Sequence, residues 1–396
     1  MKNSILTILF LLLFASTSLA QNDFEIGGYA KYLFSTAKYP QFDERLFDHI
    51  IHSRLNTKYF FDESLSLTGE FRFRTFFGNS VKKFPDYSEL IKTNQPLLKL
   101  DWMIWKNQNT IGYAEADRLY FDYNANNFQL TLGKQRIAWG TSWVWNPTDL
   151  FNPLSILDFD YEELPGSDAL RIQYYTGAVS KIEFAIAPNR NKDKLTAAGL
   201  VSINAVKYDF NFLVGVKNKK WFAGFSWVGD IADAGFRGEL LLMQKPDKIS
   251  KYDQIYNLYN ESSLTETNNL FFSFVLSGDY TFPNSFYVHS EVLYNNLGKT
   301  NSAGLFAQEA NELGLLSPSR WSLFQEFSYN ISPLVRGSIF GIINPDDKSS
   351  VVVPSISYSV ITNLDLYLIA LIFNGENLTQ YGDYGTSFYA RLKYSF

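Results

Sequence analysis

Hydrophobic and polar residues alternate along most of this chain with a period of two. In residues 388–396, apolar or aromatic side chains occupy every even position, and the odd positions include Arg391 and Lys393. This alternation is typical of a β-strand with one apolar face and one polar face. Such a strand suits a wall between lipid and water, because each face meets the solvent that it prefers.

Similar segments of about ten residues recur along the chain, which is the length that a tilted strand needs to cross a membrane. We predict about 18 strands, with 16 as the alternative number, as in large barrels that enclose an aqueous channel. The predicted strands cover residues 25–35, 50–60, 64–77, 112–123, 127–137, 168–176, 179–187, 198–207, 209–217, 219–228, 235–243, 270–280, 285–295, 320–329, 334–343, 350–360, 363–373 and 384–396.

The connections between these strands fall into two alternating classes. Short turns are predicted at 61–63, 124–126, 176–178, 208–209, 282–284, 331–333 and 362–363. Longer, more polar links are predicted at 36–49, 78–111, 138–167, 188–197, 244–269, 296–319 and 374–383. Short periplasmic turns and long outer loops are the asymmetry of outer-membrane barrels. We therefore predict an all-β fold, a transmembrane antiparallel β-barrel whose closure leaves no strand edge in lipid.

The first residues have the features of a secretory signal peptide. Lys2 is followed by an apolar run at 5–14 and by the small-residue site Ser18–Ala20. This run is shorter than the roughly 20 residues of a transmembrane helix. We therefore expect a cleaved signal peptide at 1–20 and one barrel domain at 21–396.

The terminal Phe396 resembles the assembly signal of Gram-negative outer-membrane barrels, which typically finish on an aromatic residue. The resemblance implies presentation of Phe396 to the barrel-assembly machinery, with outer-membrane lipid around the barrel. We expect the protein in the outer membrane of a Gram-negative bacterium. The sequence leaves open whether it forms a homo-oligomer.

Composition narrows the class further. Aromatic residues make up 17% of the chain, and a membrane barrel can place them outside as interfacial girdles. There is no cysteine, hence no disulfide, thiolate metal site or lipoprotein anchor, and the net charge of −5 gives no reason to expect nucleic-acid binding. A secreted β-sandwich or propeller is the alternative fold. It is disfavoured because no repeat of 40–50 residues is present and Leu65, Leu67, Phe71 and Phe73 share one uncharged face.

Charged residues are concentrated on the opposite face of several predicted strands. Arg or Lys at the lipid midplane costs about 2–4 kcal/mol, so these side chains are expected to face the lumen or the rims. Any one of them can simply be a paired lumen charge, but a charged wall hydrates a channel and sets its ion preference. The inward set is Glu70, Arg72, Arg74, Arg171, Lys181, Glu183, His289, Glu291, Arg391 and Lys393.

The most distinctive segment is the link 138–167 with its approach. Three tryptophans, Trp139, Trp143 and Trp145, fall within seven residues, and exposing all of them to water gains nothing. We expect this loop to pack against the inside of the barrel wall. From Trp139 to Ala169 the chain has six acids and no Lys or Arg, the acids being Asp149, Asp158, Asp160, Glu162, Glu163 and Asp168.

The segment Gly-Lys-Gln-x-x-x-Trp-Gly at 133–140, followed by Asn-Pro-Thr-Asp at 146–149, resembles the Gly-(Arg/Lys)-Gln segment of porin-like outer-membrane barrels. More distantly it resembles the 18-stranded alginate-export family, although a clear arginine ladder for polyuronates is missing. In porins the third outer loop often folds inward and narrows the pore. The resemblance implies this role for 138–167, which is the third outer loop by our numbering.

These observations predict a channel for passive diffusion of small hydrophilic solutes, with a preference for sugars or anions. We expect the acidic loop to face a basic wall and to form the constriction. The alternatives are a scaffold or adhesin barrel and a polysaccharide export pore. The candidate pore-lining residues are Arg72, Arg74, Arg136, Trp139, Trp143, Trp145, Asp149, Asp158, Asp160, Glu162, Glu163 and Arg171.

Enzyme and metal functions are disfavoured. His49, His52 and His289 are the available histidine bases, and none belongs to a recognisable nucleophile motif such as Gly-x-Ser-x-Gly. We predict no enzyme and no cofactor. Residues 158–163 could offer oxygen ligands to Ca²⁺, but their spacing matches no known loop, and a solvated acidic surface is favoured. A TonB-type transporter is disfavoured because the first predicted strand leaves no room for a plug domain.

Overall fold

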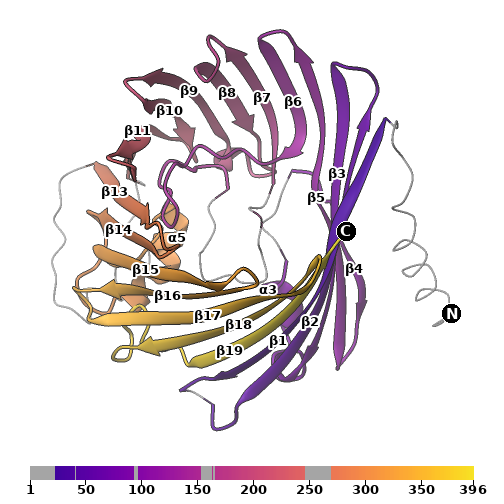
Figure 1. The fold of residues 1–396 in the computed structure, drawn as a ribbon, viewed down its shortest axis with the longest axis vertical. Coiled ribbons are helices and arrows are strands. Elements are labelled where there is room, and N and C mark those ends of the chain that lie inside the picture. The colour runs from indigo at the N-terminus through magenta and orange to yellow at the C-terminus, as the bar shows by residue number, and fades with distance from the viewer. Residues whose placement is uncertain (1–22, 41, 93–96, 153–162, 164–165, 246–268) are drawn as a thin grey trace.

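The computed structural model describes residues 23–40, 42–92, 97–152, 163, 166–245 and 269–396. The described strands form one antiparallel sheet that closes on itself, because β1 pairs with both β2 and β19 (Figure 1). The strands are β1(Phe24–Lys38), β2(Leu46–Phe60), β3(Leu65–Gly78), β4(Asp101–Lys106), β5(Thr110–Ala125), β6(Phe128–Gln135), β7(Ser167–Tyr175), β8(Lys181–Ala187), β9(Thr196–Ala205), β10(Tyr208–Lys217), β11(Lys220–Ile231), β12(Ala234–Gln244), β13(Leu270–Thr281), β14(Tyr287–Asn295), β15(Trp321–Ser332), β16(Val335–Asn344), β17(Ser349–Ile361), β18(Leu364–Asn374) and β19(Thr386–Ser395).

Eighteen of these strands form the barrel, and the predicted fold is confirmed. The additional strand, β4, was not predicted and lies within the expected link 78–111. It pairs with residues 111–115 of β5, whereas β6 pairs with residues 119–125 of the same strand. β4 and β6 therefore pair with successive parts of β5, and β4 is not one of the 18 strands that close the barrel.

The two ends of the barrel differ in their connections. We call the end with the long links the loop end and the other the turn end. Two links at the loop end, 218–219 and 345–348, are short as well, so the predicted alternation of short and long connections is incomplete. Asn218 and Lys219 have φ angles of 52° and 65°. Positive φ at both central residues is the geometry of a two-residue type I′ hairpin, which follows the twist of the strands.

Helices in the described residues are short and lie in loop-end links: α2(Asn79–Lys83), α3(Tyr87–Leu90), α5(Ala307–Leu313) and the 3₁₀ turns η1(Lys192–Lys194) and η2(Ala303–Phe306). None of the helices in the described part of the chain is long and apolar enough to cross a membrane.

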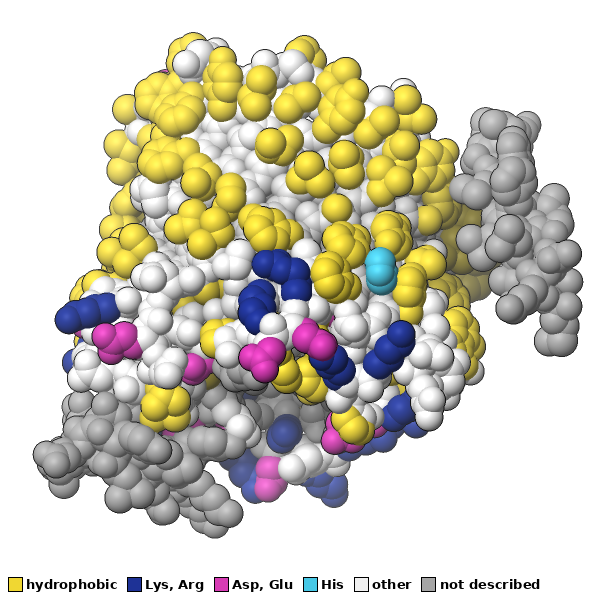
Figure 2. Space-filling model, turned by 90° about the horizontal axis from the view of Figure 1, so that it is seen from below, with side chains coloured by type: hydrophobic (Ala, Val, Ile, Leu, Met, Phe, Trp, Pro, Cys, Tyr) yellow, Lys and Arg dark blue, Asp and Glu magenta, His cyan; other side chains and the backbone are white. Residues whose placement is uncertain are grey.

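The wall is apolar outside and polar inside. Outward-facing side chains such as Phe73, Phe212 and Leu368 are exposed, whereas inward-facing Arg72 and Glu239 are buried. Figure 2 shows hydrophobic side chains spread over the outer face, with the charged side chains of this view gathered toward one end. This distribution is the reverse of a water-soluble domain and is that of a barrel spanning a membrane.

Candidate functional site

The segment 136–152 leaves β6 at the loop end and runs inside the barrel (Figure 1). Trp139 is 4% exposed, and its Nε1 donates a hydrogen bond to Glu183 Oε1 on β8 at 2.7 Å. Ile137, Trp139 and Leu150 pack with inward-facing apolar residues of the wall. The expectation that this loop packs against the inner wall is therefore met for the described residues. The larger wall residues of this cluster are Leu200, Leu213, Phe222, Leu241, Met243 and Phe271.

Glu239 on β12 is the first wall residue that fixes this loop. Its buried carboxylate accepts hydrogen bonds from the backbone N–H groups of Thr141 (2.6 Å), Ser142 (2.8 Å) and Thr148 (3.0 Å). The Thr148 hydroxyl donates another at 2.7 Å. Several N–H groups converging on one anion form a backbone nest, and hydrogen bonds to a charged acceptor are roughly twice as strong as neutral ones.

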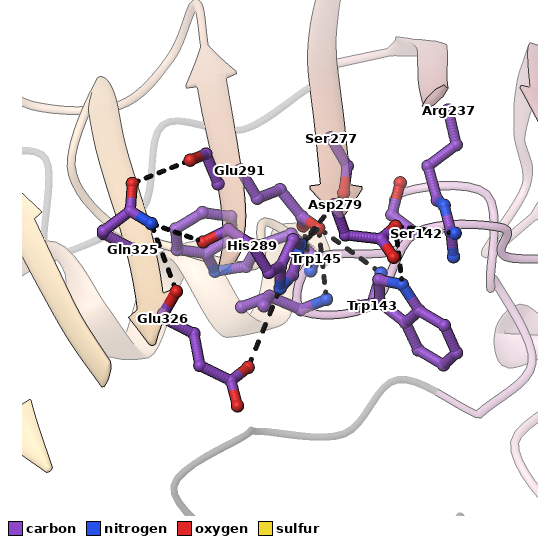
Figure 3. Close-up of polar contacts among 12 residues, drawn as sticks. Ser142, Trp143, Trp145, Arg237, Ser277, Asp279, His289, Glu291, Gln325 and Glu326 are labelled. Carbon is purple, nitrogen blue, oxygen red and sulfur yellow. Dashed lines mark hydrogen bonds and ion pairs between the residues drawn. The ribbon is translucent and has the colours of Figure 1, made fainter. Parts of the chain in front are cut away.

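Glu291 on β14 is the second fixing residue (Figure 3). Its buried carboxylate accepts N–H bonds from Trp145 at 2.7 Å and, more weakly, from Trp143 at 3.3 Å and Val144 at 3.4 Å. The loop is thus held to the wall by its own backbone. At this contact the carboxylates belong to the wall, whereas the sequence led us to expect acidic side chains on the loop. Asp158, Asp160 and Glu162 lie outside the described residues, as does most of the segment considered for Ca²⁺.

The three tryptophans have different surroundings. Trp145 is 5% exposed and packs with Val144 against Val275, Leu293 and other residues of the wall. Trp143 is 60% exposed, although it projects from the same loop. The sequence offered no signal that separates Trp143 from its neighbours.

Asp149 is a buried acid of the loop. Burial raises its pKa to about 7, with Arg136 opposing the shift and Glu239 adding to it. Arg136 itself is exposed. The adjacent carbonyl of Leu150 accepts a hydrogen bond from Lys217 Nζ at 2.7 Å. This acid therefore titrates near neutral pH, where its charge would lie beside the Glu239 carboxylate.

Three of the four arginines predicted to line the pore, Arg72, Arg74 and Arg171, lie on the inner face of the wall and are paired. Arg72 bonds Glu115, and Arg74 donates to the same carboxylate at 3.2 Å. Arg171 donates to Glu183 at 2.5 and 3.0 Å.

Arg54 is an inner-wall residue that the sequence reasoning missed. It is fully buried on β2 and lies directly beside Arg72 in the strand register. Its guanidinium pairs with Glu70, with Asp117 at 2.8 Å and with Glu163 at 2.6 Å. These three carboxylates are close enough together to hold a metal ion, but the guanidinium already provides a cation among them. In the predicted strand 50–60, Arg54 falls at an inward-facing position of the alternating pattern, and this position was the signal that could have identified it.

A row of bases crosses the wall near the point where the barrel closes. Lys393, Lys31, His52 and Arg74 are direct neighbours in register on β19, β1, β2 and β3. Counted around the 18 strands, β2 and β12 are nine positions apart, because β4 is outside the ring. The centre of this basic row therefore lies across the lumen from Glu239 on β12.

One group of side chains has the composition of a hydrolase triad. Ser277 Oγ lies 3.0 Å from His289 Nε2, and Glu326 Oε2 lies 3.9 Å from His289 Nδ1. Ser277 is only 1% exposed, and Glu291 also approaches His289 Nε2 at 3.4 Å. The Ser277 hydroxyl is buried, and its histidine is shared with Glu291. This is not the arrangement of an accessible nucleophile with its own base, so the geometry does not support catalysis here.

No protein-family model matches the sequence, and no curated protein matches it. Solved structures match over nearly the whole chain. Acinetobacter baumannii OccAB1 has a TM-score of 0.57 with 9% identity, covering 94% of this chain and 96% of its own.

The chain has the fold of a porin. A BenF-like porin from Pseudomonas fluorescens Pf-5 has a TM-score of 0.54 at 10% identity, covering 94% of this chain and 98% of the porin. OmpF of Salmonella typhi, solved with daunomycin, has a TM-score of 0.50 at 10% identity, covering 95% and 98%. At these identities the likeness concerns the fold, and the motif at 133–140 stays a prediction.

Proposed function

We propose that this porin-like barrel is an outer-membrane channel for passive diffusion of small hydrophilic solutes, with loop 138–167 as its constriction. The observation that carries the proposal is the attachment of 141–148 to Glu239 and Glu291, residues six and eight strands around the barrel from β6. A loop fixed in this way reduces the open cross-section. Open space remains beside it, since a cavity of about 1910 Å³ is lined by Trp145, Phe151 and residues of the loop-end links.

The charge distribution suits polar solutes. The basic row of β19, β1, β2 and β3 has its centre across the lumen from Glu239 on β12. Charges in a narrow, partly water-excluded space are poorly screened, so a transverse field is expected between the two sides. Such a field favours solutes that carry a dipole or a charge over apolar ones.

The apolar outer face supports a location in the outer membrane, with lipid around the wall. Residues 1–20 as a cleaved signal peptide, residues 21–396 as the mature barrel and Phe396 as an assembly signal stay predictions. The oligomeric state is left open.

Reconstitution of the full mature chain in planar bilayers tests the proposal. We expect ion-conducting channels and uptake of small sugars, amino acids or dicarboxylates in liposome swelling. Deleting 141–165 should raise single-channel conductance, while heat-modifiable gel migration shows that the barrel stays folded. A barrel that folds but conducts no ions would favour a function as a scaffold or adhesin. Unchanged conductance after the deletion would place the constriction elsewhere, and passage of long polysaccharides would favour an export pore.

A further inference from the structure

Trp143 is the exposed aromatic residue on the lumen side of the loop. Burying an indole gains free energy, and both neighbouring tryptophans are buried, so its 60% exposure calls for an explanation. The side chain is nevertheless held in place. Its Nε1 lies 3.4 Å from Asp279 Oδ1 on β13, and the Arg237 guanidinium of β12 lies 4.7 Å from its ring centroid.

The holding residues are themselves fixed. Arg237 Nη2 donates to Asp279 Oδ1 at 2.9 Å, so cation and acid form one unit around the indole (Figure 3). Because Arg237 covers one face of the ring, the exposed area belongs to its other face and its edges. A rigid aromatic face is therefore presented to the lumen, with little rotamer entropy left to lose when a solute stacks on it.

Polar groups continue from this ring along the wall. Asp279, His289 and Glu326 are direct neighbours in register on β13, β14 and β15. Two strand spacings separate the first from the last, which is about 10 Å. Tyr287, two residues before His289 on β14 and nearer the turn end, lies within electrostatic range of Asp279, Glu326, Arg237 and Arg336. Two acids and two bases leave this part of the wall without net charge.

We propose that Trp143, with Arg237, Asp279 and Glu326, forms a subsite that binds the pyranose ring of a sugar. An aromatic face suits the C–H side of such a ring, and carboxylates and a guanidinium suit its hydroxyls as acceptors and donors. An aromatic anion would stack equally well on the ring, but a wall without net charge, whose Arg237 already pairs with Asp279, offers its carboxylate no spare cation. The subsite lies on the turn-end side of the loop. The Trp143 side chain contacts Asp279, which is two residues nearer the turn end on β13 than Ser277, the register neighbour of Glu291. This inference rests on the proposed function, whose substrate class it names.

The test is current block of the reconstituted channel by maltose, with sodium benzoate as the aromatic anion. Maltose should reduce the ion current saturably. Loss of one stacked ring contact in Trp143→Ala should raise the half-blocking concentration about fivefold. Trp143→Phe keeps an aromatic face and should stay close to the unsubstituted channel. Trp321→Ala is the matched control, since it removes a tryptophan from the outer face, 40% exposed, and should change nothing.

The outcomes separate the two proposals. A chain that conducts no ions contradicts the proposed function itself. A conducting channel that maltose does not block, or a block that Trp143→Ala leaves unchanged, overturns the subsite alone. Equal loss of block in the Ala and Phe variants would assign Trp143 a role in holding the loop through its indole N–H and would overturn stacking. Benzoate block that depends on Trp143, without maltose block, would overturn the sugar class.

Discussion

Replacing Glu239 by Gln should release the loop from the wall without unfolding the barrel. The carboxylate binds donors through both oxygens: Thr141 and Ser142 through Oε1, and Thr148 through Oε2. Gln has one oxygen and one NH₂ group. Whichever way the amide is turned, one of these two sets of donors then faces another donor.

The size of the effect follows from the lost contacts. A hydrogen bond to a charged acceptor contributes about 1.5–3 kcal/mol, and Thr148 alone donates two of them. With partial relaxation of the loop, we expect a net loss of about 3 kcal/mol of docking free energy. This corresponds to a change on the order of 100-fold in the ratio of docked to undocked loop. The strand ladder does not involve the Glu239 side chain, so the barrel should keep its heat-modifiable gel migration.

Single-channel recording is the assay. Glu239→Gln should show frequent transitions to a larger conductance level that the unsubstituted channel visits rarely. Glu326→Gln is the matched control, because it also removes one inner-wall carboxylate but no hydrogen bond to the loop is found for Glu326 among the described residues. Traces of Glu239→Gln that match those of both other channels would refute the idea that this carboxylate holds the loop.

Three further predictions follow from paired or buried charges. The pKa of Asp149 is raised to about 7 in the docked loop, against about 4 in the undocked loop, so docking is most favourable below pH 4 and weakens as pH rises from 4 to 7; open-channel noise should therefore grow between pH 4 and pH 7 and level off at higher pH, and Asp149→Asn should abolish this change. Reversal of Arg72 and Arg74 to Glu should shift reversal potentials in a KCl gradient toward cation selectivity, and an unchanged potential would remove these residues from the ion path. Arg54→Met removes the guanidinium that pairs with the buried Asp117 and with Glu70, which should cost about 3–5 kcal/mol and lower the midpoint of thermal unfolding, unlike Arg336→Met at an exposed position.

The period of two was sufficient to predict all 18 barrel strands, because each of them has one face toward lipid and one toward the interior. β4 does not follow this rule. Its residues Trp102, Met103, Ile104 and Trp105 are apolar on both faces, and it pairs with half of β5 only. Pattern alone therefore could not place it beside the wall. The short link 218–219 was missed as a loop-end connection, since its residues carry no Gly that would mark a tight hairpin.

The site was predictable in part. Three tryptophans in a polar link indicated a loop that packs against other residues, and Trp139 and Trp145 are buried in this way. Its partners could not be read from the chain, since Glu239 and Glu291 contact the loop from 91 to 148 residues away in sequence. Glu291 was expected to face inward, and Glu239 was overlooked although it interrupts an apolar strand. An isolated acid at an inward position is the signal to look for.

Because backbone N–H groups make the contacts to Glu239 and Glu291, most side chains between 141 and 148 are not needed to attach the loop to the wall. Only proline is incompatible with the donor positions, since it has no N–H. Thr148 adds its hydroxyl, and Trp143 adds its indole N–H, which lies 3.4 Å from Asp279 Oδ1. If the proposed channel function and subsite hold, exchange of the residue at 143 would change the favoured solute, while the N–H contacts to Glu239 and Glu291 keep the loop where it is. Adaptation to a new nutrient would then require one codon and no refolding of the pore.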